Sequence, residues 1–113
     1  MNNIIAHRGF WKELSEQNSE LAFRRAIECG FGIETDLRDF NEEIVISHNM
    51  ANSSAILFDK FMELTQVNPH LTLALNIKAD GLQESLISKT IANLHFYFDM
   101  SIPDMLGYKN KNL

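Results

Sequence analysis

Two acidic residues near the end of a short apolar run have a spacing that could support chemistry. Glu34 and Asp36 stand two positions apart in the run from Gly30 onward. If this run is a β-strand, alternate side chains share a face, so the two carboxylates lie about 6–7 Å apart on one side. Carboxylates that converge in this way suit a hard divalent cation such as Ca²⁺ or Mg²⁺. The alternative is that both acids are simply solvated.

Further polar residues follow apolar runs in the same manner. They are His7 with Arg8, His48, Lys78 and Asp99. In parallel α/β proteins the carboxyl ends of the strands meet at one edge of the sheet, and ligands bind there. The sequence therefore predicts one site that brings these residues together with the two acids.

The residue types in this predicted site favour phosphoryl chemistry. His7 and His48 can act as general base and general acid, because the unperturbed pKa of histidine lies near neutral pH. Arg8 can bind phosphate oxygens as a fork and Lys78 as a point charge. The sequence contains neither a glycine-rich phosphate loop nor a Gly-x-Ser-x-Gly elbow. The alternatives are structural hydrogen bonds for each histidine and a solvated strand-end lysine.

The spacing of apolar residues predicts strands that alternate with helices, which is the pattern of parallel strands joined by helical crossovers. Strands are expected over 3–7, 33–37, 44–48, 71–78 and 96–98, and helices over 19–29, 57–65, 82–91 and from 102 onward. The first strand is expected to be buried. The turn at 41–43 is too short for a helix. The segments on either side of it are therefore expected to form either an antiparallel ribbon of two strands or one strand with its extension. On the last strand, His95, Tyr97 and Asp99 are expected on one face. This is the face directed into a confined interior, opposite to the face that packs on the helices.

Composition indicates a single globular domain over residues 1–113, with 45% apolar and 22% charged residues. The net charge of −5 argues against a nucleic-acid partner, which would need clustered basic residues. The single cysteine excludes an internal disulfide and a cysteine cluster for a metal. No apolar run reaches the length of a transmembrane segment and no signal peptide is evident, so a cytoplasmic location is expected.

The order and spacing of several short motifs resemble the start of the glycerophosphodiester phosphodiesterase family, which is related to phosphatidylinositol-specific phospholipase C. The family pattern runs H-R-G, E-N-T, E-x-D, H-D and E-x-K. The matching stretches here are His7-Arg8-Gly9, Gln17-Asn18-Ser19, Glu34-x-Asp36, Val45-x-x-His48 and Asn76-x-Lys78. The resemblance covers Ile4 to Lys78 well and the remainder loosely.

This resemblance implies a (β/α)₈ TIM-type barrel, of the PLC-like phosphodiesterase class, that hydrolyses glycerophosphodiesters. The products are an alcohol and a phosphomonoester, and the reaction depends on a divalent cation, Ca²⁺ or Mg²⁺. By resemblance, His7 and His48 are the catalytic acid–base pair. Glu34 and Asp36 match metal ligands, and Arg8 matches a residue that contacts phosphate, as does Lys78.

Three amides stand where the family has acids. They are Gln17, Asn49 and Asn76, of which the last occupies the position of the third metal ligand. An amide carbonyl can bind Ca²⁺ but brings no charge, so the resemblance implies a weakened metal site. Asp99 could compensate for the missing acid if it faces the same interior.

The chain is short for the implied fold, because a (β/α)₈ barrel typically needs about 250 residues. With 113 residues it spans the N-terminal half of such a barrel, as a single, apparently truncated domain. A half-barrel leaves unpaired strand edges, so the expected partners are a small phosphodiester substrate and either a second copy or a missing C-terminal half. The alternative function is that of an inactive remnant or a phosphate-ligand-binding module.

Overall fold

The computed structural model describes residues 4–113, so Asn3, in the first predicted strand, lies outside the described residues. The strands are β1 (Ile5–His7), β2 (Gly32–Phe40), β3 (Glu43–Ile46), β4 (Ile56–Leu57), β5 (Leu73–Ile77) and β6 (His95–Phe98). The helices are α1 (Glu20–Glu28), α2 (Phe58–Thr65), α3 (Gln83–Leu86) and α4 (Ile102–Asn110), with a 3₁₀ turn η1 (Leu14–Glu16).

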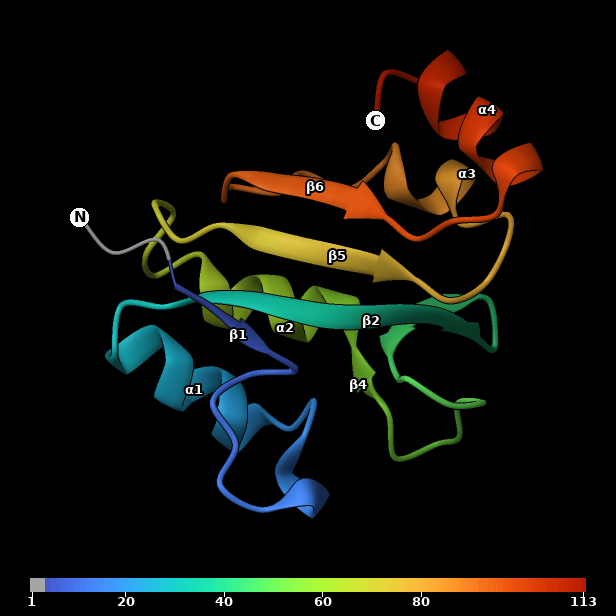
Figure 1. Ribbon diagram of the computed structural model, residues 1–113. Helices are drawn as coiled ribbons and strands as arrows, with labels where there is room; N and C mark the ends of the chain where they lie inside the picture. The colour runs from blue at the N-terminus through green and yellow to red at the C-terminus, as the bar shows by residue number, and fades with distance from the viewer. Residues whose placement is uncertain (1–3) are drawn as a thin grey trace.

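All six strands belong to one mixed sheet, which Figure 1 shows across the middle of the molecule. The strand order is β4-β3-β2-β5-β6, and β1 pairs with β2 as well. β1, β2, β5 and β6 run parallel, whereas β3 and β4 are antiparallel to their neighbours. The α/β class with parallel strands and helical crossovers is therefore confirmed, as is the antiparallel ribbon of β2 and β3. Strand β4 was not predicted.

The hydrophobic core lies between the sheet and the helices α1 and α2, and it extends to residues of α3 and α4. Alternate residues of β2, including Ile33 and Leu37, face these helices together with apolar residues of β5. Phe23 of α1 and Phe61 of α2 are fully buried there, and their rings meet edge to face with centroids 4.8 Å apart. Because apolar residues use this face, Glu34 and Asp36 of β2 are left on the opposite face.

Helix α1 begins and ends as the sequence predicts. The hydroxyl of Ser19 accepts a hydrogen bond from the backbone N–H of Ala22, which is the usual N-cap contact. Gly30 follows the last helical turn with a φ of +74°, a left-handed conformation that glycine adopts without strain. The helix therefore has a fixed start and a fixed end, and it holds the loop that precedes it in place.

A second glycine lets the chain after β1 pass close to α1. The backbone N–H of Phe10 donates to the carbonyl of Ala22 at 2.9 Å. Gly9 itself has a φ of +85°, and a Cβ at this position would lie 2.8 Å from the Cβ of Ala22. This close approach fixes where Arg8, the residue before it, leaves the sheet.

We expect Gly9→Ala to lower the free energy of unfolding by about 2–5 kcal/mol. About 1–2 kcal/mol comes from the left-handed conformation and about 1–3 kcal/mol from overpacking against α1. Gly30→Ala is the matched control, because Gly30 has a positive φ but no atom within 4 Å of the added Cβ. Urea unfolding should show a loss of only about 1–2 kcal/mol for the control. Equal losses in the two variants would show that the contact with α1 is unimportant.

Three expectations are wrong. The first strand was expected to be buried, but Ile5 is 41% exposed. The reason is that β1 lies at an edge of the sheet and pairs only with β2. The third helix ends at Leu86, and Ile87 is largely exposed. There the hydroxyl of Ser88 bonds the carbonyl of Ser85, a local contact that competes with helix continuation.

The third error concerns the face of the last strand. Tyr97 pairs with Leu75 of β5 and packs against Tyr108 of α4, with ring centroids 5.5 Å apart. Its face is therefore the helix-covered face, and burial there raises the pKa of Tyr97 to about 12. Phe96 and Phe98 lie on the opposite face, in register with Ala74 and Asn76.

No helix within residues 4–113 is both long and apolar enough to cross a membrane.

Candidate functional site

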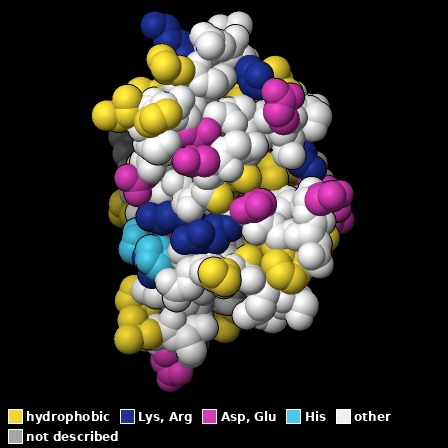
Figure 2. Space-filling view, turned by 90° about the vertical axis from the view of Figure 1, so that its right-hand side faces the viewer, with side chains coloured by type: hydrophobic (Ala, Val, Ile, Leu, Met, Phe, Trp, Pro, Cys, Tyr) yellow, Lys and Arg dark blue, Asp and Glu magenta, His cyan; other side chains and the backbone are white. Residues whose placement is uncertain are grey.

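The pairing of β2 with its neighbours brings the predicted acids beside predicted partners from other strands. His7, at the end of β1, is the register partner of Glu34, and Asn76 of β5 is the register partner of Asp36. All four side chains belong to the face of the sheet that α1 and α2 do not cover. Figure 2 looks onto the carboxyl ends of β2, β5 and β6, where Lys and Arg side chains gather beside histidine.

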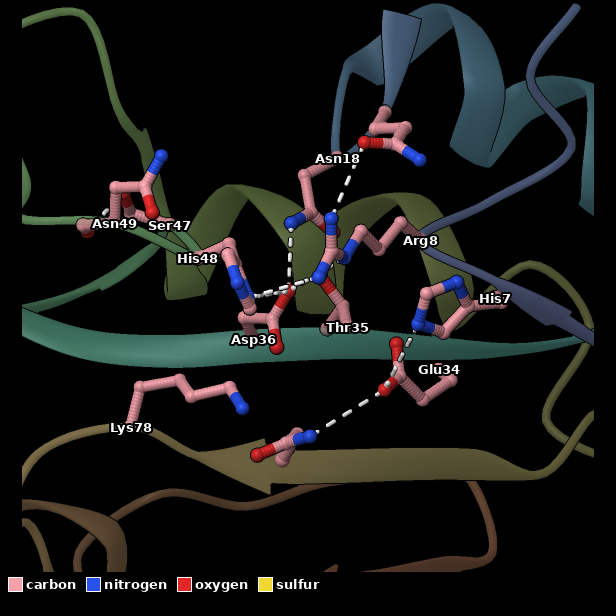
Figure 3. Close-up of polar contacts among 12 residues, drawn as sticks. His7, Arg8, Asn18, Glu34, Thr35, Asp36, Ser47, His48, Asn49 and Lys78 are labelled. Carbon is pink, nitrogen blue, oxygen red and sulfur yellow. Dashed lines mark hydrogen bonds and ion pairs between the residues drawn. The ribbon is translucent and has the colours of Figure 1, made fainter. Parts of the chain in front are cut away.

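Asp36 is the most deeply buried acid of the site, with 1% of its surface exposed. Its Oδ2 lies 3.3 Å from Nε of Arg8 and 3.6 Å from Nδ1 of His48, and it accepts a hydrogen bond from the amide of Asn18 at 2.9 Å. Figure 3 shows these four side chains converging above β2. A buried carboxylate with a cationic partner and hydrogen bonds is compensated for its loss of solvation.

The contact between Arg8 and His48 fixes the tautomer of the histidine. Nη2 of Arg8 lies 2.9 Å from Nδ1 of His48. A guanidinium only donates, so Nδ1 must be the acceptor and the proton of the neutral ring must sit on Nε2. Because Nε2 already carries a proton, a second proton on His48 goes to Nδ1. Nδ1–H can then donate to the carboxylate of Asp36 in place of accepting from Arg8. The site thus offers a partner to both charge states of His48.

A second group of contacts surrounds Glu34, two residues before Asp36 on β2. Nε2 of His7 is 3.8 Å from Oε2 of Glu34, and the amide nitrogen of Asn76 donates to the same oxygen at 3.5 Å. His7 is well exposed, with 63% of its side-chain surface accessible. In Figure 3, His7 and His48 lie on opposite sides of Arg8. The two predicted catalytic residues therefore flank the predicted phosphate-binding arginine.

Three buried oxygens of the site have no hydrogen-bond partner among residues 4–113. They are Oε1 of Glu34, Oδ1 of Asp36 and Oδ1 of Asn76. Unpartnered buried oxygens are costly, and carboxylate and amide oxygens are the ligands that Ca²⁺ and Mg²⁺ prefer. The described residues contain no group of three or more His, Cys, Asp or Glu placed to hold a metal ion. A cation here would therefore rest on two carboxylates and one amide carbonyl, with the remaining positions open.

Lys78 and Asp99 pair with each other. Nζ of Lys78 lies 3.2 Å from Oδ2 of Asp99, whose side chain is 58% exposed. Figure 3 shows Lys78 at the end of β5, beside Asp36 and His48, where it can reach an anion. The structure does not group Asp99 with Glu34 and Asp36, so its expected role as a compensating acid has no geometric support.

Two residues that sequence analysis did not assign to the site help to build it. Asn18 bridges two neighbours on β2: its carbonyl accepts from the hydroxyl of Thr35 at 2.7 Å, and its amide donates to Asp36. Arg38 donates to the backbone carbonyl of His48 from Nε at 3.1 Å and Nη2 at 3.0 Å. The only signal for Arg38 in the sequence is its position two residues after Asp36. The signal for Asn18 is its place within the family-like motif Gln17-Asn18-Ser19.

The loop before α1 is held by Glu16. Its pKa is lowered chiefly by the hydrogen bond from the backbone N–H of Lys12, and then by the side chain of Arg25. The next residue, Gln17, accepts a hydrogen bond from Nη1 of Arg8 at 3.2 Å. The amide thus supports the arginine without adding charge to the site.

A cavity of about 540 Å³ opens beside the paired Arg8 and His48. It lies between the loop at 14–20 and the segment at 46–56. Its volume falls within the range of about 300–1,000 Å³ that is typical of small-molecule sites. The cavity gives a bound anion at Arg8 room for an attached group.

Comparisons of this chain with protein-family models, with curated proteins and with solved structures give no match.

Proposed function

We propose that this chain carries a phosphodiesterase site that cleaves small phosphodiesters with the help of a divalent cation. The observation that carries the proposal is the placement of His7 and His48 on either side of Arg8, above two carboxylates with unpartnered oxygens. A phosphodiester needs cationic groups for its charge and proton donors and acceptors for its ester oxygens. The site offers both within one cluster.

Each residue has a defined role in this proposal. Arg8 binds a phosphate oxygen, and Lys78 contributes a second positive charge. His48 acts as a proton donor or acceptor toward the substrate through Nδ1. Asp36 stabilises the protonated ring, and Arg8 donates a hydrogen bond to the neutral ring. His7, which is exposed and lies within 3.8 Å of Glu34, is the second proton donor or acceptor of the acid–base pair. A cation held by Glu34, Asp36 and Asn76 would neutralise developing negative charge on the phosphate.

The proposed fold is the N-terminal half of a (β/α)₈ barrel of the PLC-like phosphodiesterase class. Parallel strands joined by helices support this proposal, as do His7 and Lys78 at the carboxyl ends of β1 and β5. Over residues 4–113 the sheet is open, with β6 at one edge and β1 and β4 at the other. A second copy or a C-terminal half would close it.

A second candidate is a phosphate-binding module of the same architecture without catalysis. The neutral amides Gln17, Asn49 and Asn76 favour it, because fewer acids give weaker binding of the cation. Arg8, Lys78 and the histidines would still bind an anion. The two candidates differ in turnover alone.

Hydrolysis of bis(p-nitrophenyl) phosphate separates the candidates. We expect release of nitrophenol with Ca²⁺ or Mg²⁺ and none above background with EDTA. Metal-dependent turnover supports the phosphodiesterase. Absence of turnover in a folded chain that binds inorganic phosphate supports the binding module.

The cation itself should stabilise the fold. A ligand at 100 times its Kd raises the free energy of unfolding by about 2.7 kcal/mol, so Ca²⁺ or Mg²⁺ should raise the Tm. Glu34→Gln should reduce this rise because it removes one of the two carboxylates. Asp99→Asn is the matched control and should leave the rise unchanged, since Asp99 pairs with Lys78. A rise that disappears with Asp99→Asn would place the cation at Asp99.

A further inference from the structure

The cavity beside Arg8 and His48 has a lining that is specific enough to select a class of substrate. Its polar lining is made of hydroxyl and amide side chains from two separate segments. They include Ser15, Gln17, Ser47, Asn49, Asn52 and Ser54. Amides and hydroxyls can both donate and accept, so each can bind an alcohol group in either direction.

Several of these groups remain available to a ligand. The hydroxyl of Ser54 and its backbone N–H both donate to Oδ1 of Asn52, so the nitrogen of that amide has no partner among residues 4–113. Within the same described range, the side chains of Asn49 and Ser15 make no hydrogen bond, and Gln17 uses only its carbonyl oxygen. The cavity therefore presents unused donors and acceptors on both of its sides.

The cavity lacks what a cationic alcohol such as choline would need. Among its described lining residues none is Trp, Tyr or Phe, so the ring faces that bind a quaternary ammonium are missing. The one carboxylate in the lining belongs to Glu20, and it accepts from Nε of Arg24 at 2.8 Å. Arg8, which also lines the cavity, adds a positive charge. An ammonium group would meet no free negative charge and one fixed positive charge.

Aliphatic side chains complete the lining. Ile46, Ala55 and Ile56 line the cavity together with the polar groups. A ring that carries several hydroxyls presents polar edges and apolar C–H faces, and this combination matches both kinds of lining. A long acyl chain would leave the amides and hydroxyls without partners, which costs free energy.

We propose that this cavity binds the alcohol group of the phosphodiester and selects an uncharged polyhydroxylated ring, such as a cyclitol or a sugar, over an amino alcohol. The proposal rests on the proposed function, because it places the phosphate at Arg8 and His48. Arg8 and His48 line the cavity themselves, so a phosphate bound to them has one ester group directed into it.

The test is a comparison of binding by calorimetry, with EDTA present to prevent turnover. Glycerophosphoinositol should bind at least about tenfold more tightly than glycerophosphocholine, a difference of about 1.4 kcal/mol. Asn49→Asp should reduce this preference at least threefold, since it adds a negative charge that attracts the trimethylammonium group. Asn110→Asp on α4 is the matched control, because it adds the same charge at an exposed residue outside the cavity lining, and it should leave the ratio unchanged.

Equal affinities for the two diesters, no binding of either, or a ratio that Asn49→Asp does not change would overturn the proposal. Circular dichroism of Asn49→Asp confirms that the variant is folded; its exposed side chain has no partner that the change would break. This result is independent of the hydrolysis of bis(p-nitrophenyl) phosphate, which carries no polyol. A chain that prefers glycerophosphoinositol but hydrolyses nothing retains the cavity assignment and loses the phosphodiesterase.

Discussion

Replacing His48 by alanine is expected to lower the hydrolysis of bis(p-nitrophenyl) phosphate by about 10²- to 10⁴-fold, the usual contribution of a general acid or base. The physical reason is the double partnership of Nδ1. Arg8 donates a hydrogen bond to Nδ1 in the neutral ring, and Asp36 lies 3.6 Å away, where it can accept a hydrogen bond from Nδ1–H in the charged ring. His7→Ala should have an effect of the same order.

The matched control for both variants is His70→Ala. His70 is an exposed loop residue, and its ring has no contact with the site among the described residues. Activity should stay within a factor of about two of the unchanged chain, because surface changes away from special features have small effects. If His48→Ala keeps full metal-dependent activity, the proposed role of His48 is wrong. If His70→Ala loses activity as well, the loss reports on folding and not on chemistry.

The strand ends are the part of the site that local sequence could predict. His7 and Lys78 follow short apolar runs, and the period of two placed Glu34 and Asp36 on one face without any knowledge of the fold. The expectation that these two acids lie at the end of their strand is wrong, because β2 continues to Phe40 and leaves both acids in its middle. The starts of the helices expected at 19 and 102 were equally local, since Ser19 and Ser101 each accept a hydrogen bond from the backbone N–H three residues on. Features set by neighbours along the chain were therefore predictable.

Contacts between distant segments were not predictable in the same way. Asn18 stands in a family-like motif, but only the structure shows that it bridges Thr35 and Asp36, because the loop before α1 folds over β2. The face of β6 was wrongly assigned, because a short aromatic run, Phe96–Phe98, gives no indication of which side a helix will cover. In the structure α4 covers Tyr97, and this also brings the following Asp99 next to Lys78.

The second large effect concerns stability. Asp36→Ala is expected to lower the free energy of unfolding by about 3–5 kcal/mol, the usual cost of removing one partner of a buried ion pair. Asp36 is 1% exposed and the side chain of Arg8 is 19% exposed, so the guanidinium left behind is poorly solvated. The variant also leaves the amide of Asn18 without its acceptor. For a domain whose total stability is about 5–15 kcal/mol, such a loss is a large fraction.

Asp39→Ala provides a control on the same strand, because Asp39 lies on β2 but is exposed. Its cost in urea unfolding should stay within about 0.5 kcal/mol. The double variant Arg8→Ala with Asp36→Ala tests the cause of the loss, since it removes the stranded charge together with its partner. We expect it to be less destabilised than the sum of the two single variants. Additive losses would show that the two residues do not interact, and the low exposure of Asp36 would then reflect packing alone.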